Sequence, residues 1–190
     1  MPTGSTEGKP GIVIALGSNT GDTLNNLRTG AAQLRERLGL QLRLSRPWLT
    51  DPVDCPPGSP RFANAAAVTD SPSEFEPTVL LQELKRIEQL LGRRPKLVMN
   101  EPRPIDLDLI YFGDETLNTA ELILPHPRAH ERHFVLAPLA ELCPKLVFPG
   151  HRCTVKDYLD HCDRDPTARP IDSFSWELSS TQDPTLRKQD

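Results

Sequence analysis

An α+β fold with a mainly antiparallel sheet flanked by helices is predicted for this chain of 190 residues. Short apolar runs interleave with amphipathic helical patterns, and no internal repeat is present. The turns are tight and the connections short, which argues against a purely parallel sheet with its long crossovers. With 37% apolar and 25% charged residues, the composition is that of a folded, globular chain.

The first part of the chain predicts two strands and a helix before a long loop. Ile12 to Leu16 is an apolar run followed by turn residues, as in a buried strand. From residue 22 to 38, leucine and alanine recur every three or four residues, which predicts a helix ended by Gly39. Leucines alternate with polar residues over 40–46, which predicts a half-buried strand. Residues 47–61 are rich in proline and predict a long irregular loop.

The remainder continues the pattern of strands and helices. The main predicted elements are a strand over 62–69, a helix from Pro77 to Gly92, a strand over 105–112 and helices over 134–142 and 154–162. Short extended pieces are expected at 122–124 and 146–148. Residues 93–104 form a second irregular stretch, which carries several basic side chains.

One domain with two tails is the expected organisation. Residues 1–10 resemble a flexible leader, 11–163 the domain, and 164–190 a polar tail that Phe174 and Trp176 could attach to the surface. The net charge of −4 argues against a nucleic-acid partner, and no apolar stretch reaches the roughly 18 residues of a membrane span. The four cysteines, without a secretory signal, indicate free thiols and a cytoplasmic protein.

Two aspartates within the strand over 105–112 are the sharpest chemical feature. Asp106 and Asp108 are two residues apart, so their side chains point to the same side of a strand, with Cα atoms about 6.5–7 Å apart. Such carboxylates suit Mg²⁺ beside substrate phosphates, although a solvated sheet face is the alternative. Ile110 and Phe112 are expected to continue the same face and indicate that it is buried.

Other side chains could complete a phosphate and heterocycle site. Arg103 supplies positive charge near the aspartates, if it is not simply solvated. Further basic groups follow along the chain at His126, Arg128, His130, Arg132 and His133. Phe62 and Asn64 leave the long loop on one strand face. With the more distant Phe134, they could stack on and hydrogen-bond a flat heterocycle, or else belong to the core.

Several other kinds of site are disfavoured. No P-loop pattern is present, and the spacing of His151, Cys153, His161 and Cys162 is not that of a structural zinc site. The turn over 17–21 could bind an anion at a helix start, but a helix cap is the more common use of such residues.

The motifs, taken in order, resemble the 6-hydroxymethyl-7,8-dihydropterin pyrophosphokinase family. They are ALGSNTGD (15–22), RFANAAA (61–67), LKRIEQLLGR (84–93), PRPIDLDLIYFGD (102–114) and LPHPRAHERHFVLAPLAELCP (124–144). The resemblance covers roughly residues 11–163. It implies an enzyme of folate biosynthesis that transfers pyrophosphate from ATP to a pterin alcohol. It also implies a ferredoxin-like sandwich in which the loops 47–61 and 93–104 move over the active site.

The resemblance further implies a role for each site residue. Asp106 and Asp108 would hold two Mg²⁺ ions and, with Arg103, form the catalytic centre. ATP would contact Arg103, His126, Arg132, Glu88 and Lys96. The pterin would contact Thr50, Val53, Phe62, Asn64 and Phe134.

One stretch departs from the family pattern. Met99 and Asn100 occupy positions where many members carry an arginine and a tryptophan, and Glu101 adds a negative charge. The alternative function is therefore a catalytically weak homologue that binds pterin or nucleotide and acts through a partner. A D-x-D glycosyltransferase is disfavoured, because the pattern of a doubly wound sheet is absent. Association with neighbouring folate-pathway enzymes is a further expectation.

Overall fold

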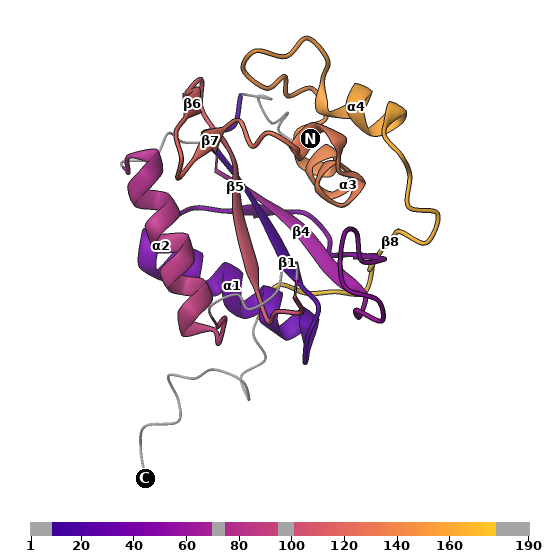
Figure 1. The fold of residues 1–190 in the computed structure, drawn as a ribbon. Coiled ribbons are helices and arrows are strands. Elements are labelled where there is room, and N and C mark those ends of the chain that lie inside the picture. Colours follow the sequence, from indigo (N-terminus) through magenta and orange to yellow (C-terminus); the bar gives the residue numbers. More distant parts are fainter. Residues whose placement is uncertain (1–8, 70–74, 95–100, 178–190) are drawn as a thin grey trace, which may run out of the picture.

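The computed structural model describes residues 9–69, 75–94 and 101–177, which form one main sheet with helices on both faces (Figure 1). The three long strands are β1 (Ile12–Ser18), β4 (Phe62–Thr69) and β5 (Asp106–Phe112). Short edge strands extend it: β2 (Arg43–Leu44), β3 (Trp48–Thr50) and β8 (Arg169–Pro170). The order is β5-β1-β4-β3-β8, with β2 also paired to β4, and these pairings are antiparallel.

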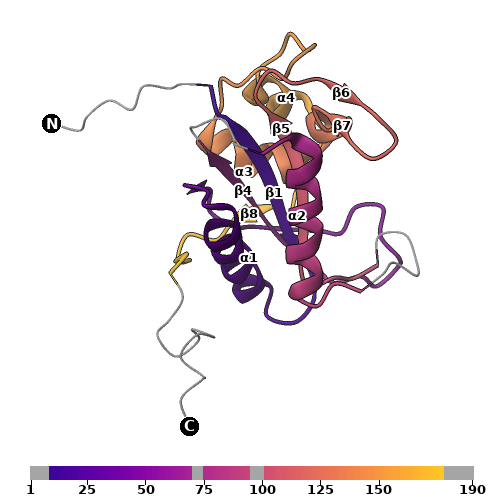
Figure 2. The ribbon, with the colours of Figure 1, turned by 90° about the vertical axis from the view of Figure 1, so that its left-hand side faces the viewer.

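Two pairs of helices enclose the sheet. α1 (Thr23–Leu38) and α2 (Pro77–Leu90) cover one face, whereas α3 (His133–Leu142) and α4 (Val155–His161) lie on the other (Figure 1, Figure 2). The connection from β5 to α3 holds a hairpin of β6 (Leu117–Asn118) and β7 (Ile123–Leu124), then a 3₁₀ turn, η1 (Ala129–Glu131). Within the described ranges, no helix is long and apolar enough to span a bilayer.

The core lies in two layers because the central strands are apolar on both faces. Ala63, Ala65 and Ala67 of β4 pack towards α1 and α2, whereas Ala66 and Val68 pack towards α3 and α4. Such alternation follows from the two-residue period of a strand. On α1, the predicted face is buried at Leu27, Ala31, Leu34 and Leu38, and Gly39 ends the helix in the left-handed region at φ 62°.

The connectivity is that of the ferredoxin-like sandwich. After β1 and α1 the chain enters the sheet at β2 and β3, and β4 then returns between these edge strands and β1. α2 crosses back, and β5 joins the other side of β1. The predicted α+β class with a mainly antiparallel sheet is therefore confirmed.

Four predicted elements differ from the structure. The strand expected over 40–46 shortens to β2, and the piece at 146–148 is a single bridge between Val147 and Thr154. β3 lies inside the predicted loop 47–61, and β8 lies inside the predicted tail beyond residue 164. Strands of two or three residues show no periodicity, so only their pairing partners reveal them.

A bulge in β5 changes which side chains share a face. Ile14 pairs with Leu109 but Val13 pairs with Tyr111, so Ile110 is the extra residue. Beyond it the alternation reverses, and Phe112 packs with the α1 and α2 layer. The expectation that Phe112 continues the face of Asp106 and Asp108 is therefore wrong, although Ile110 does lie on the α3 side.

Candidate active site

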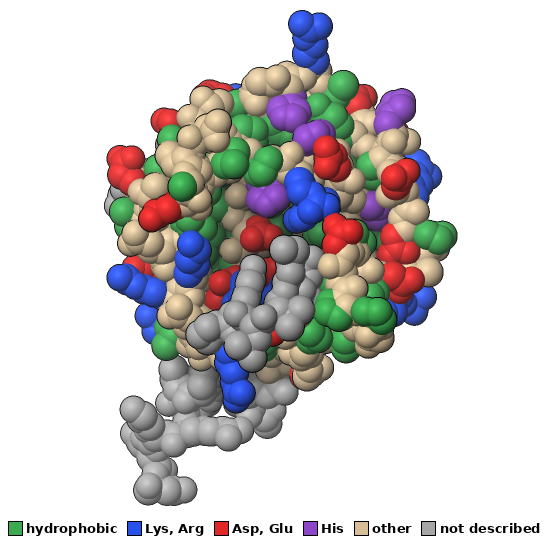
Figure 3. All heavy atoms as spheres, in the orientation of Figure 1, with side chains coloured by type: hydrophobic (Ala, Val, Ile, Leu, Met, Phe, Trp, Pro, Cys, Tyr) green, Lys and Arg blue, Asp and Glu red, His purple; other side chains and the backbone are tan. Residues whose placement is uncertain are grey.

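A cavity of about 570 Å³ opens where the three long strands meet loop 50–55 and the start of α3. In the sheet, Gly17 of β1 pairs with Asn64 of β4 on one side and with Asp106 of β5 on the other. These three residues therefore form a row across the floor of the cavity. Figure 3 shows acidic, basic and histidine side chains gathered on this face of the molecule.

Gly17 keeps this floor open. A Cβ atom added at this position would lie 3.0 Å from Oδ1 of Asn64 and 3.9 Å from the ring of Phe62. The first distance is closer than ordinary van der Waals contact, so a larger residue would displace the Asn64 side chain.

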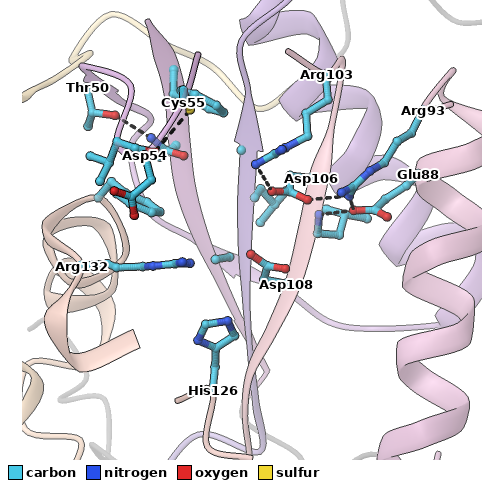
Figure 4. Close-up of a pocket in the computed structure, with 18 of the residues that line it drawn as sticks. Thr50, Asp54, Cys55, Glu88, Arg93, Arg103, Asp106, Asp108, His126 and Arg132 are labelled. Carbon is cyan, nitrogen blue, oxygen red and sulfur yellow. Dashed lines mark hydrogen bonds and ion pairs between the residues drawn. The ribbon is translucent and has the colours of Figure 1, made fainter. Parts of the chain in front are cut away.

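Asp106 is the centre of an ion-pair cluster. Arg93 contacts both Glu88 and Asp106, and Nη2 of Arg103 lies 2.9 Å from Oδ2 of Asp106 (Figure 4). Glu88 also accepts a hydrogen bond of 2.7 Å from the backbone N–H of Leu107. Burial raises the pKa of Glu88 to about 7, while this hydrogen bond and Arg93 act in the opposite direction.

Asp108 has no such partner. Among the described residues, none forms a hydrogen bond or an ion pair with its carboxylate, which lies beside Asp106 on the same strand face (Figure 4). Burial raises the pKa of Asp108 to about 6, with a further contribution from the charge of Asp106. A carboxylate in this position is stabilised by a cation, so the donor set fits a hard divalent ion.

These ligands would leave most of a metal's coordination to the substrate. In the described part of the chain, no cluster of three or more His, Cys, Asp or Glu side chains is arranged to hold a metal. Mg²⁺ commonly takes only one or two carboxylates and completes its shell with phosphate oxygens and water. Asp106 and Asp108 match that requirement.

His126 faces the same region as a neutral donor. Burial, reinforced by the positive charge of Arg132, lowers the pKa of His126 to about 4. Its Nδ1 accepts a hydrogen bond of 3.2 Å from the backbone N–H of Arg128. A neutral ring that accepts at Nδ1 carries its proton on Nε2, so Nε2–H is a donor.

Beside Arg103 and Arg132, the cavity is lined by two aromatic rings and one polar edge. The guanidinium carbon of Arg103 lies 5.8 Å from the Phe62 ring centroid, and that of Arg132 lies 5.5 Å from the Phe134 centroid. Nδ2 of Asn64 donates a 2.8 Å hydrogen bond to Oγ1 of Thr50, which leaves Asn64 Oδ1 as an available acceptor.

The structure brings nearly all the residues implied by the resemblance into one cavity. Its lining includes Thr50, Val53, Phe62, Asn64, Glu88, Arg103, Asp106, Asp108, His126, Arg132 and Phe134. Lys96 lies outside the described residues, as do Met99 and Asn100, which depart from the family pattern.

Sequence reasoning missed three contributors. Arg93 begins the irregular stretch 93–104 and forms an ion pair with Asp106, and its position directly after the helix-ending Gly92 is a usable signal. Asn19 accepts from the N–H of Arg103 at 2.8 Å and donates its own N–H to the Arg103 carbonyl at 3.2 Å. Gly17 and Asn19 belong to the turn considered as an anion site. The helix itself is capped by Asp22, which accepts from the N–H of Asn25.

Comparison with known proteins gives one family. Residues 13–144 match the family model described as 7,8-dihydro-6-hydroxymethylpterin-pyrophosphokinase. A 2-amino-4-hydroxy-6-hydroxymethyldihydropteridine pyrophosphokinase of Synechocystis is 37% identical over 162 residues, which cover 85% of this chain and 81% of the relative. The protein of the same name from Bacillus subtilis is 40% identical over 134 residues, covering 70% and 78%.

Longer proteins contain the same unit. A "Folate synthesis bifunctional protein" of Arabidopsis thaliana is 41% identical over 69% of this chain, which spans only 26% of that relative. Two solved structures share the fold. One is an HPPK-DHPS in complex with substrates, with a TM-score of 0.61, 14% identity, and coverage of 78% of this chain and 42% of that one. The other, Plasmodium falciparum HPPK-DHPS with pteroate, has a TM-score of 0.63, 14% identity, and coverage of 78% and 43%.

Proposed function

Because this chain belongs to the 7,8-dihydro-6-hydroxymethylpterin-pyrophosphokinase family, we propose that its cavity binds ATP and the pterin alcohol on either side of Asp106 and Asp108. The enzyme performs the pyrophosphokinase step of folate synthesis. The observation that carries the residue-level proposal is the pair of neighbouring carboxylates, one ion-paired with two arginines and one without a described partner.

Asp106 and Asp108 hold Mg²⁺ in this proposal, with two ions as the expected number. Bound Mg²⁺ would offset phosphate charge and orient the phosphate chain. The unpartnered carboxylate of Asp108 supports the assignment, since it places a negative charge that needs compensation beside the cavity. Arg93 and Arg103 compensate Asp106 in the unliganded protein.

The phosphates of ATP lie against the basic side of the cavity. Arg103 and Arg132 present guanidinium donors suited to phosphate oxygens, and His126 adds a neutral Nε2–H donor. Glu88 acts indirectly, because its carboxylate holds Arg93 and the backbone N–H of Leu107. The family resemblance implies a further ATP contact at Lys96.

The pterin lies on the aromatic side. Phe62 and Phe134 supply apolar surfaces for a flat ring, and Asn64 with the backbone near Thr50 and Val53 supplies polar contacts to its edge. The open floor at Gly17 leaves room beside Asn64.

In the proposed reaction, the pterin hydroxymethyl oxygen bonds to the β-phosphorus of ATP. The bond from that phosphorus to the oxygen bridging the α- and β-phosphates breaks, AMP leaves, and the hydroxyl proton passes to solvent or phosphate. Since the described side chains include no obvious general base, positioning and charge compensation would supply most of the rate enhancement.

The test removes each carboxylate while keeping its shape. Asp106→Asn and Asp108→Asn should lower turnover by at least about 100-fold, because a carboxamide binds Mg²⁺ poorly. AMP formation from ATP and the pterin alcohol is measured by chromatography, with circular dichroism as a check on folding. Asp114→Asn is the matched control, because that aspartate is exposed and pairs with Lys9 away from the cavity. Near-normal turnover in both variants would contradict the metal assignment. Tight pterin binding without turnover in the wild type would favour a catalytically weak homologue.

We extend the proposal to the partners and the location of the enzyme. The bifunctional names of several relatives support an association of this enzyme with neighbouring folate-pathway enzymes. The four cysteines are free thiols, which supports a reducing compartment such as the cytoplasm.

A further inference from the structure

Residues 165–176, here named the strap, close over the edge of the sheet beside the pterin side of the cavity. β8 of the strap pairs with β3, joining Leu49 to Arg169 and Trp48 to Pro170. The N–H of Ile171 donates to the carbonyl of Pro47 at 2.8 Å. The strap lies entirely beyond residues 13–144, the part of the chain that matches the family model.

A closed ring of polar contacts joins the strap to the loop 51–61. The N–H of Asp51 donates to Oδ2 of Asp165 at 2.8 Å, and Oδ1 of Asp165 accepts from the N–H of Thr167 at 2.8 Å. Nη2 of Arg61 donates to the carbonyl oxygen and Oγ1 of Thr167, both at 2.9 Å. An ion pair of 2.7 Å between Nε of Arg61 and Oδ1 of Asp51 completes the ring.

The ring contacts the loop only at its two ends. Asp51, which follows β3 directly, lines the cavity, as do Val53, Asp54 and Cys55, and Arg61 precedes β4 directly. Prolines restrict the backbone of this loop, so the position of its ends constrains its middle. Holding the two ends together therefore also holds the wall of the cavity.

The far end of the strap is attached to the domain. Nε1 of Trp176 donates to the carbonyl of Ser45 at 3.0 Å, and the Trp176 ring packs against the core layer between the sheet and the helices α1 and α2. Nε of Arg28 donates to the carbonyl of Ser175 at 2.7 Å, with its guanidinium 4.4 Å from the Phe174 ring centroid. The strap is thus fixed on both sides of β8 and can transmit a fixed position to the loop.

We propose that the strap sets the affinity of the pterin site, with Asp165 and Thr167 as positioning residues that act through Asp51 and Arg61. This inference rests on the proposed assignment of the pterin to the Phe62 and Asn64 side of the cavity. Among the described residues, no member of the ring forms a hydrogen bond or an ion pair with Arg103, His126 or Arg132, so nucleotide binding should be independent of it.

Two near-isosteric variants of the full chain test the ring. Asp165→Asn can keep an acceptor for Thr167, but its amide N–H₂ then faces the N–H of Asp51. Thr167→Val keeps the shape and removes the hydroxyl acceptor of Arg61. Asp172→Asn is the matched control, because this strap aspartate pairs with Arg46 and not with the loop. Thr167→Ser restores the hydroxyl and should behave as wild type.

Two measurements separate the strap from the pterin assignment. Hydrogen exchange of the amides of Asp51 and residues 53–55 reports the loop without any ligand. Calorimetric titration reports the dissociation constants of the pterin alcohol and of Mg²⁺ with ATP. We expect faster loop exchange and about fivefold to tenfold weaker pterin binding in Asp165→Asn and Thr167→Val, the scale of one or two lost hydrogen bonds. ATP affinity and the control should be unchanged.

Each other outcome has one meaning. Loop exchange equal to wild type in both variants would overturn the proposal, as would faster exchange with unchanged pterin affinity. An equal weakening of ATP and pterin binding would also overturn it, since that indicates a general loss of structure. If wild-type protein with a protected loop binds no pterin, the proposed function fails, and the exchange data still decide whether the strap holds the loop.

Discussion

At the scale of single residues, the two aspartates of the site, Asp106 and Asp108, differ in their ion-pair partners. Asp106 and Asp108 lie on one face of β5, yet only Asp106 is ion-paired by Arg93 and Arg103. Their common face follows from strand alternation and was predicted from the sequence. The inequality between them was not, because Arg93 comes from the segment that follows α2 and Arg103 from the segment before β5.

This difference in ion-pair partners predicts that Asp108→Asn stabilises the metal-free protein although it lowers activity. Without divalent cations at pH 8, Asp108→Asn should stabilise the fold by about 1 kcal/mol, since it removes a buried charge whose pKa is raised, and one pKa unit corresponds to about 1.4 kcal/mol. Urea unfolding with a chelator measures this free energy.

Adding Mg²⁺ with ATP should reverse the order of stability, so that the wild type becomes more stable than Asp108→Asn. The wild type then gains stability from ligand binding that the variant lacks. A variant that is less stable than wild type in the chelator would contradict the view that burial of the Asp108 charge costs stability in the metal-free protein.

At the scale of elements, the short helix α4, which packs with α3, is stabilised at its first turn. α4 has seven residues and begins with a capping box, in which Oγ1 of Thr154 accepts from the N–H of Asp157 at 3.1 Å. In return, Oδ2 of Asp157 accepts from the N–H of Thr154 at 2.8 Å. The predicted helix over 154–162 is confirmed to within one residue at each end.

Thr154→Ala should therefore destabilise the protein by about 1 kcal/mol, the usual effect of removing such a cap. Thr154→Ser retains the hydroxyl and is the control, expected within a few tenths of the wild-type value. Both are compared by urea unfolding. Because α4 lies away from the cavity, kcat should not change. Equal stability of the alanine variant would show that tertiary packing alone holds α4.

At the scale of the whole molecule, the pH dependence of stability combines groups of opposite sign. The pKa of His126 is lowered by burial, so between its folded value of about 4 and its ordinary value near 6.5 the unfolded chain binds the extra proton. His126 therefore lowers the free energy of unfolding as the pH falls below 6.5, and above pH 6.5 it has no such effect. The raised pKa values of Glu88 and Asp108 act in the opposite direction, since the folded state then retains protons longer as the pH rises.

Comparison with His126→Gln isolates the first contribution. The stability of wild type relative to this variant should decrease as the pH falls from 6.5 towards 4, with a slope of at most about one proton. Unfolding curves at a series of pH values give this difference. His161→Gln is the control, because that side chain is exposed at the end of α4. A difference independent of pH would mean that His126 titrates normally in the folded protein.

The sequence by itself determined the long strands, the helices and the shared face of Asp106 and Asp108. These features depend on local periodicity and on caps, which are visible in a few consecutive residues. The tertiary structure decided the pairing of β8 with β3, the bulge at Ile110 and the partners of Arg93. Each of those depends on contacts between residues distant in the chain, whose free energy exists only once the sheet and helices have assembled. For the same reason, the composition of the strap predicted only a tail. Its role depends on the contacts of Asp165 with Asp51 and of Thr167 with Arg61, which only the tertiary structure shows.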